Sequence, residues 1–192
     1  MAKSSKKKNK QKKNNKTKKN NLMLKREQMD RERTLLEERK NKWINLGIFI
    51  IYAIILIIVA FHHELWRDEA QSWLIAKNLG FIKIIGQLKY EAHPFLWYYL
   101  LRVFSLFGLK YDYITIVPVL LNLIATYFIL NKSKFSKITN VIIVFSSGLF
   151  FYCGILARSY SLAYLLMVLL AFCYKDRYKK PLYYGVLLFF II

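Results

Sequence analysis

Two adjacent carboxylates, Asp68 and Glu69, follow closely on a long uncharged apolar segment, residues 43–61. A carboxylate at a membrane boundary can take a proton from an attacking hydroxyl, or hold a divalent cation through its oxygen atoms. The same acids can instead start a helix, because the helix dipole favours negative charge in the first turn. Arg67 could then simply be their counter-ion. These residues alone leave both interpretations open.

A second cluster, "YEAHPFLWYY", places Glu91 and His93 just before Pro94, which suits the first turn of a helix. A Glu-x-His pair can supply a cation ligand or a hydrogen-bond donor for a phosphate. The alternative is an interfacial helix end, where the following Trp and Tyr residues form an aromatic belt.

A third cluster, "ARSYSLAYLL", places Arg158 and Tyr160 between two apolar segments. Arginine at membrane depth is costly unless it faces a cavity, a carboxylate or a phosphate. The alternative is a short interfacial turn from which the arginine extends its head group to water.

No familiar metal-binding spacing occurs in the sequence. His62, His63 and Glu64 lack the HExxH spacing of zinc enzymes. Cys153 and Cys173 both lie in apolar segments, where a cysteine is a small buried hydrophobe. The metal requirement is therefore open, with a divalent cation at the acid pair as the candidate cofactor.

Charge and apolarity are segregated along the chain, which excludes a single soluble domain. Of the 192 residues 56% are hydrophobic, yet the net charge is +20, and residues 1–20 contain ten lysines and no acid. The sequence predicts a disordered lysine-rich tail at 1–21, a charged cytoplasmic juxtamembrane helix at 22–42, and a membrane domain at 43–192.

Anionic lipid headgroups are the expected partners of the lysine-rich tail. A lysine block beside a membrane span acts as a topological anchor and is attracted to the anionic cytoplasmic leaflet. No nucleic acid is expected, because no aromatic residue interleaves with the lysines to stack on bases.

The elements that must position the three clusters are membrane helices. Residues 43–61 are long enough to cross a bilayer, with the tail in the cytoplasm, and residues 62–92 predict short interfacial helices in an outer loop. The fold class is an all-α polytopic transmembrane bundle. Its further apolar segments are 95–109, 113–130, 138–156, 161–174 and 181–192. The last stops in mid-helix, so we expect the amino-terminal part of a longer protein.

The direction of the later spans depends on residues 95–109. If this segment crosses the membrane, strict alternation places the lysines of 132–137 and 175–180 outside, against the positive-inside rule. Either the segment does not cross, or the charge rule is overridden here. We favour the first, which places Arg158 and Tyr160 on the same outer face as Asp68.

The order of the clusters resembles the amino-terminal part of polytopic glycosyltransferases of the GT-C superfamily. These include the dolichyl-phosphate-mannose protein mannosyltransferases and the bacterial family 39-like enzymes. The family's D-E of the first outer loop corresponds to Asp68-Glu69. Its H-P-P-L-x-Y, which opens the second membrane helix, corresponds to H-P-F-L-W-Y at 93–98, and its S-R-x-A-R-x-Y region to A-R-S-Y-S-L-A at 157–163.

The resemblance covers residues 43–174, with two departures. Phe95 replaces a second proline that is common in the family, and the chain is shorter than the family requires. We expect the chain to be an integral membrane protein of a bacterial plasma membrane, with its amino terminus in the cytoplasm.

The resemblance implies transfer of a sugar from a polyprenyl-phosphate donor to an acceptor hydroxyl, with inversion. Asp68 would be the general base or would orient the acceptor, and Glu69 would support it or help bind a divalent cation. His93 and Arg158 would contact the lipid phosphate. The substrate-binding residues that it implies are Glu91, His93, Arg158 and Tyr160.

A non-catalytic membrane protein is the alternative: a transporter fragment, a scaffold or a degenerate glycosyltransferase remnant. A transporter predicts inverted repeats with Gly or Pro interruptions at matching positions, and the sequence contains no such repeat.

Overall fold

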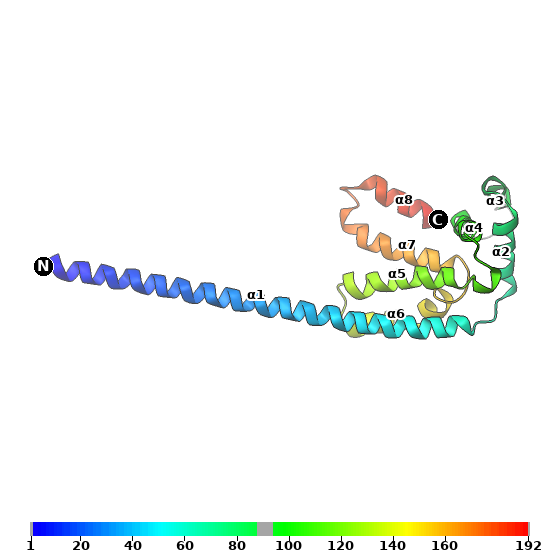
Figure 1. Ribbon diagram of the computed structural model, residues 1–192. Coiled ribbons are helices and arrows are strands. Elements are labelled where there is room, and N and C mark those ends of the chain that lie inside the picture. Colours follow the sequence, from blue (N-terminus) through cyan, green and yellow to red (C-terminus); the bar gives the residue numbers. More distant parts are fainter. Residues whose placement is uncertain (1, 88–93, 192) are drawn as a thin grey trace. The chain divides into compact units, whose positions relative to one another are not determined.

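The computed structural model describes residues 2–87 and 94–191, and every regular element in these ranges is helical (Figure 1). The predicted all-α class is therefore confirmed for the described residues. The chain forms two units, Met1–Asn45 and Leu46–Ile192.

Helix α1, Ala2–Phe61, runs through both units and ends at the residue where the apolar segment was predicted to end. The expected disorder of residues 1–21 differs from the structure, in which residues 2–21 are the first part of α1. The segment contains no Gly or Pro, and an existing helix extends more easily than a new one nucleates. The predicted charged helix at 22–42 is part of the same element.

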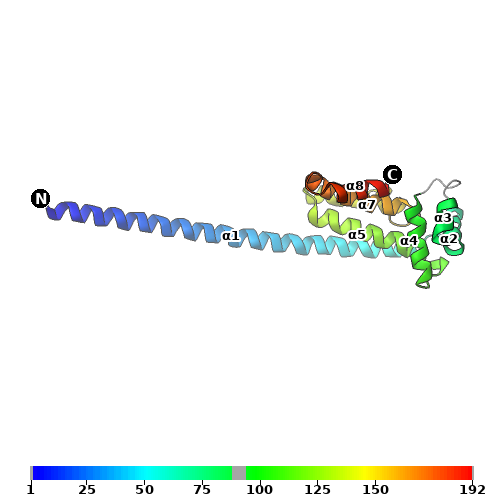
Figure 2. The ribbon, with the colours of Figure 1, turned by 90° about the horizontal axis from the view of Figure 1, so that it is seen from above.

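Helix α5, Ile116–Lys132, runs alongside the last part of α1 (Figures 1 and 2). Helix α7, Tyr160–Cys173, packs on α5, and α8, Pro181–Ile191, packs on α7. The Phe49 ring of α1 packs on the Tyr127 ring near the end of α5, at 6.1 Å between centroids. At the opposite end Phe61 and Ile116 line the same small cavity. Helix α5 is therefore antiparallel to α1.

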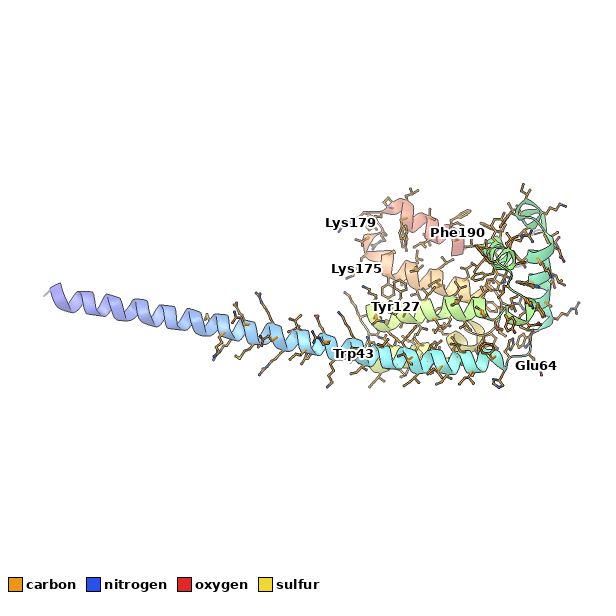
Figure 3. All side chains as sticks on the ribbon, viewed as in Figure 1. Trp43, Glu64, Tyr127, Lys175, Lys179 and Phe190 are labelled. Atoms are coloured by element: carbon orange, nitrogen blue, oxygen red, sulfur yellow. The ribbon has the colours of Figure 1, made fainter. Side chains whose placement is uncertain are left out.

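We name the two ends of this unit by these contacts. The exit end is where α1 finishes and α5 begins. The lysine end is where α5 finishes with Lys132 and where Lys175 follows the last residue of α7, Cys173 (Figure 3).

The elements between α1 and α5 gather at the exit end (Figures 1 and 2). They are α2, Arg67–Asn78; α3, Phe81–Gln87; α4, Phe95–Leu106; and the 3-10 turn η2, Tyr111–Tyr113. Helix α4 lies across the direction of α5, and its 12 residues span about 18 Å, less than a bilayer core of about 30 Å. Helix α4 therefore does not run from one end of the unit to the other.

Two helical segments, Lys25–Phe61 and Tyr111–Lys132, are long and apolar enough to cross a membrane. The predicted single span at 138–156 is wrong in one respect, because the structure divides it. Helix α6 covers Lys137–Val144, and a π-helical turn, η3, covers Gly148–Tyr152. The break falls at residues 145–147, where Ser146 and Ser147 are weaker helix formers than the apolar residues around them.

A buried polar network fixes the π-helical turn against the bundle. Asn122 of α5 is fully buried; it accepts a hydrogen bond from the Tyr52 hydroxyl of α1 at 2.6 Å and donates one to the Leu149 carbonyl at 2.8 Å. Thr126 also donates to Asn122 Oδ1, at 3.3 Å. Around this network packs an apolar cluster from α1, α5 and α7 that includes Leu56 and Val168.

Gly154 follows the π-helical turn at a point of close approach, which generates a prediction. A Cβ there would collide with the Phe150 carbonyl oxygen and lie 2.8 Å from Leu56 Cδ1. Because a backbone oxygen cannot move aside cheaply, Gly154→Ala should destabilise the protein by about 1–3 kcal/mol. Thermal unfolding in detergent measures this. Gly148→Ala is the matched control, since a Cβ there meets nothing within 4 Å, and an equal loss in both variants would contradict the prediction.

Candidate functional site

The Glu69 side chain is the centre of the exit end. It is 0% exposed and accepts three hydrogen bonds: from the Trp66 backbone N–H at 2.6 Å, from His63 Nε2 at 3.0 Å, and from the Ala157 backbone N–H at 2.5 Å. With Glu69 as an ionised acceptor, the His63 tautomer that fits this contact has its proton on Nε2. One buried group thereby joins the end of α1, the start of α2 and the segment before α7.

Glu69 holds this position because it is the third residue of α2, where a glutamate can reach back to the N–H that precedes the helix. The helix-start interpretation therefore applies to Glu69. Both of its oxygen atoms already have donors, so a cation would have to displace them. This geometry suits a positioning residue that supports its neighbour.

Asp68 is in a different environment. Its side chain is 54% exposed, and its Oδ2 forms an ion pair with Nη1 of Arg158, which is 17% exposed. The counter-ion of Asp68 is thus an arginine 90 positions away in the chain, and the adjacent Arg67 is not needed for that role. The sequence placed Arg158 on the face of Asp68, and the structure brings the two into contact.

The contacts of Asp68 and Glu69 are neighbours, and both join the start of α2 to the segment before α7. Glu69 binds the backbone of Ala157, and Asp68 binds the side chain of Arg158. Because the buried Glu69 contact fixes the backbone at Ala157, it also fixes where the ion pair between Asp68 and Arg158 forms. The arrangement presents one carboxylate and one guanidinium together at the surface.

Tyr160 flanks the exposed pair. The Arg158 guanidinium carbon lies 5.7 Å from the centroid of the Tyr160 ring, near the outer limit of a cation–π contact. Tyr160 begins α7 and is 41% exposed. Four predicted site residues therefore lie at one end of the unit: Asp68, Glu69, Arg158 and Tyr160. The other two, Glu91 and His93, lie outside the described residues.

Sequence reasoning missed His63, which it considered for zinc alone. Its side chain is 6% exposed and its ring contacts those of Trp66 and Phe151, with centroids at 6.1 and 6.2 Å. The spacing from His63 to Glu69 gives no signal, because the chain turns between α1 and α2. Within the described ranges, no three His, Cys, Asp or Glu side chains gather as a metal site.

Arg102 is the second residue whose role the sequence did not reveal. Its Nη1 donates to the carbonyl oxygens of Ala76 and Lys77 at the end of α2. A cation at a helix C-terminus satisfies free carbonyls and is favoured by the dipole. This contact ties α4 to α2 and accounts for an arginine inside an apolar segment.

No family model, curated protein or solved structure gives a significant match to this chain. The resemblance to GT-C glycosyltransferases therefore rests on the sequence motifs.

The different burial of the two acids generates a prediction. Glu69→Gln exchanges one acceptor oxygen for a donor and leaves a buried N–H without its partner, at a cost of about 1–3 kcal/mol. Asp68→Asn makes the same change in a half-exposed pair and should cost less than about 1 kcal/mol. Thermal unfolding of the two variants in detergent makes the comparison. An Asp68 variant as unstable as the Glu69 variant would contradict the assignment of Glu69 as the buried tie.

Proposed function

We propose that this chain is a membrane glycosyltransferase, or part of one, that transfers a sugar from a polyprenyl-phosphate donor to an acceptor hydroxyl at the extracytoplasmic membrane face. The observation that carries the proposal is the Asp68–Arg158 pair, held in place by Glu69. It unites at one surface the carboxylate of the first motif and the arginine of the third, which is what the chemistry requires.

The exposed surface of α1 supports the membrane placement. Ile50, Ile51, Ile54 and Ile58 are each between 48% and 57% exposed. A contiguous isoleucine face of this kind is unfavourable in water and favourable in lipid. The proposal includes a polytopic bundle whose lysine end faces the cytoplasm, by the positive-inside rule, and whose exit end faces outward.

Arg158 is the proposed phosphate-binding residue. A guanidinium binds a phosphate through two parallel N–H bonds, so a donor phosphate competes with Asp68 for it. Tyr160 beside it would hold the guanidinium in orientation. Donor binding would then release the Asp68 carboxylate at the place where the acceptor hydroxyl must lie.

Asp68 is the proposed general base. It takes the proton of the acceptor hydroxyl as that oxygen forms a bond to the anomeric carbon and the bond from this carbon to the phosphate oxygen breaks. The polyprenyl phosphate leaves with the bonding electrons, and Arg158 stabilises the charge that develops on it. Glu69 does not react; it keeps both residues at their positions.

Asp68→Asn should lower sugar transfer by about 10²–10⁴-fold, because the amide cannot accept the proton. The assay uses the full-length protein in membranes with a polyprenyl-phosphate sugar. The control is Asp112→Asn, the same change at an exposed acid of η2, which should keep full activity. Insertion and abundance should be unchanged in both. Full activity of Asp68→Asn would end the catalytic assignment, and an inactive wild-type protein would favour a non-catalytic role.

Arg158→Gln should lower kcat/KM for the donor by about 10²-fold, because one charged donor to the leaving phosphate is lost. Arg158→Lys keeps the charge but not the two parallel N–H bonds of a guanidinium. Its kcat/KM for the donor should therefore lie between those of the wild type and Arg158→Gln. Arg67→Gln is the control, since it removes an exposed arginine that adjoins Asp68 in the first turn of α2. An unchanged donor KM and kcat in Arg158→Gln would contradict phosphate binding at this residue.

A further inference from the structure

A cavity of about 590 Å³ opens at the lysine end, far along the chain from the candidate site. Its walls include Ile129 of α5 together with Met167 and Phe172 of α7, and are largely apolar. The lysines that line it, Lys132, Lys134 and Lys175, are all exposed. The cavity is therefore apolar inside and cationic where it meets water, and Figure 3 shows Lys175 at this end of α7.

The amines of Lys134 and Lys175 are close enough to affect each other. Two effects of Lys175 lower the pKa of Lys134 from its ordinary value. The larger is a hydrogen bond between the two amines, and the smaller is repulsion between like charges. Asp176 is the one acid that the sequence contains after Asp112, and its carboxylate faces Lys179 at 3.9 Å. Lys134 and Lys175 line the same cavity, so both amines can offer positive charge to one anion there.

The turn that carries Lys134 is well fixed. The Ser133 hydroxyl donates to Asn140 Oδ1 at 2.6 Å, and Ser136 caps α6 by accepting the Thr139 N–H at 3.1 Å. These bonds tie the turn to α6 at both of its ends. The backbone that carries Lys134 at the cavity is thus held in place by the connection between α5 and α6.

We propose that this cavity binds an anionic phospholipid of the cytoplasmic leaflet, with its phosphate between Lys134 and Lys175 and an acyl chain against the apolar walls. The inference rests on the membrane placement proposed above and not on sugar transfer. A free phosphate would use the lysines and leave the apolar walls in water, so the combination fits a lipid. Juxtamembrane lysines attract anionic headgroups by about 1 kcal/mol each, or about 5-fold in affinity.

Native mass spectrometry of the full-length protein, titrated with phosphatidylglycerol or phosphatidylcholine in detergent, tests the lysines. The wild type should prefer phosphatidylglycerol, and Lys134→Gln with Lys175→Gln should lower that affinity by roughly 20-fold. Lys179→Gln with Lys180→Gln is the matched control, because it removes two charges from the same end but outside this cavity. Equal affinities in the two double variants would overturn the proposal.

A second variant tests the acyl chain. Ala171 lines the cavity, so Ala171→Phe should fill it and lower phosphatidylglycerol affinity while every lysine remains. Should that variant fail to fold by thermal unfolding, Met167→Trp fills the same space. Unchanged affinity in the folded variant, or equal competition by inorganic phosphate, would reduce the site to headgroup attraction and overturn the proposal. Lipid binding here without sugar transfer would refute the proposed function alone.

Discussion

The buried carboxylate of Glu69 is the constraint on which the exit end depends. A charge removed from water is strongly unfavourable unless donors replace the lost hydration. The three donors come from three separate segments, so the group is satisfied only when α1, α2 and the segment before α7 are all in place. Burying the Glu69 carboxylate without all three donors would cost free energy, and this cost favours the one arrangement in which all three are present.

The surface pair is a consequence of that buried bond. Adjacent residues of α2 point about 100° apart, so when Glu69 faces inward Asp68 must face outward. On the facing segment the backbone of Ala157 is bound by Glu69, and the side chain of the next residue, Arg158, reaches Asp68. The two consecutive acids thus have different roles: Glu69 holds the backbone segments together, and Asp68 can exchange its partner. The structural and chemical interpretations of the acid pair each describe one residue.

Local signals predicted most of the helices. The apolar segments that end at Phe61 and begin at Pro181 correspond to observed helix boundaries, because hydrophobic runs and proline act locally. The shared face of Asp68 and Arg158 followed from charge distribution along the chain. These are properties that a linear sequence carries.

What the sequence could not supply are contacts between distant segments. The Ala157 backbone N–H has no side-chain signature, and Arg102 became intelligible only beside the end of α2. The order of burial within the acid pair was equally hidden, since two neighbouring carboxylates look alike in a sequence. The interruption at residues 145–147 also depends on Asn122, which offers its amide to a carbonyl of the π-helical turn.

That π-helical turn sets the direction in which the chain enters residues 153–159, the segment that carries Ala157 and Arg158. Its bond from the Cys153 N–H to the Gly148 carbonyl encloses one residue more than an α-helical bond would. One residue corresponds to about 100° of rotation about a helix axis. The direction from which Ala157 and Arg158 approach α2 therefore depends on a turn that lies several residues upstream, inside the bundle. A change of length in this turn would turn the arginine away from its acid without altering either residue.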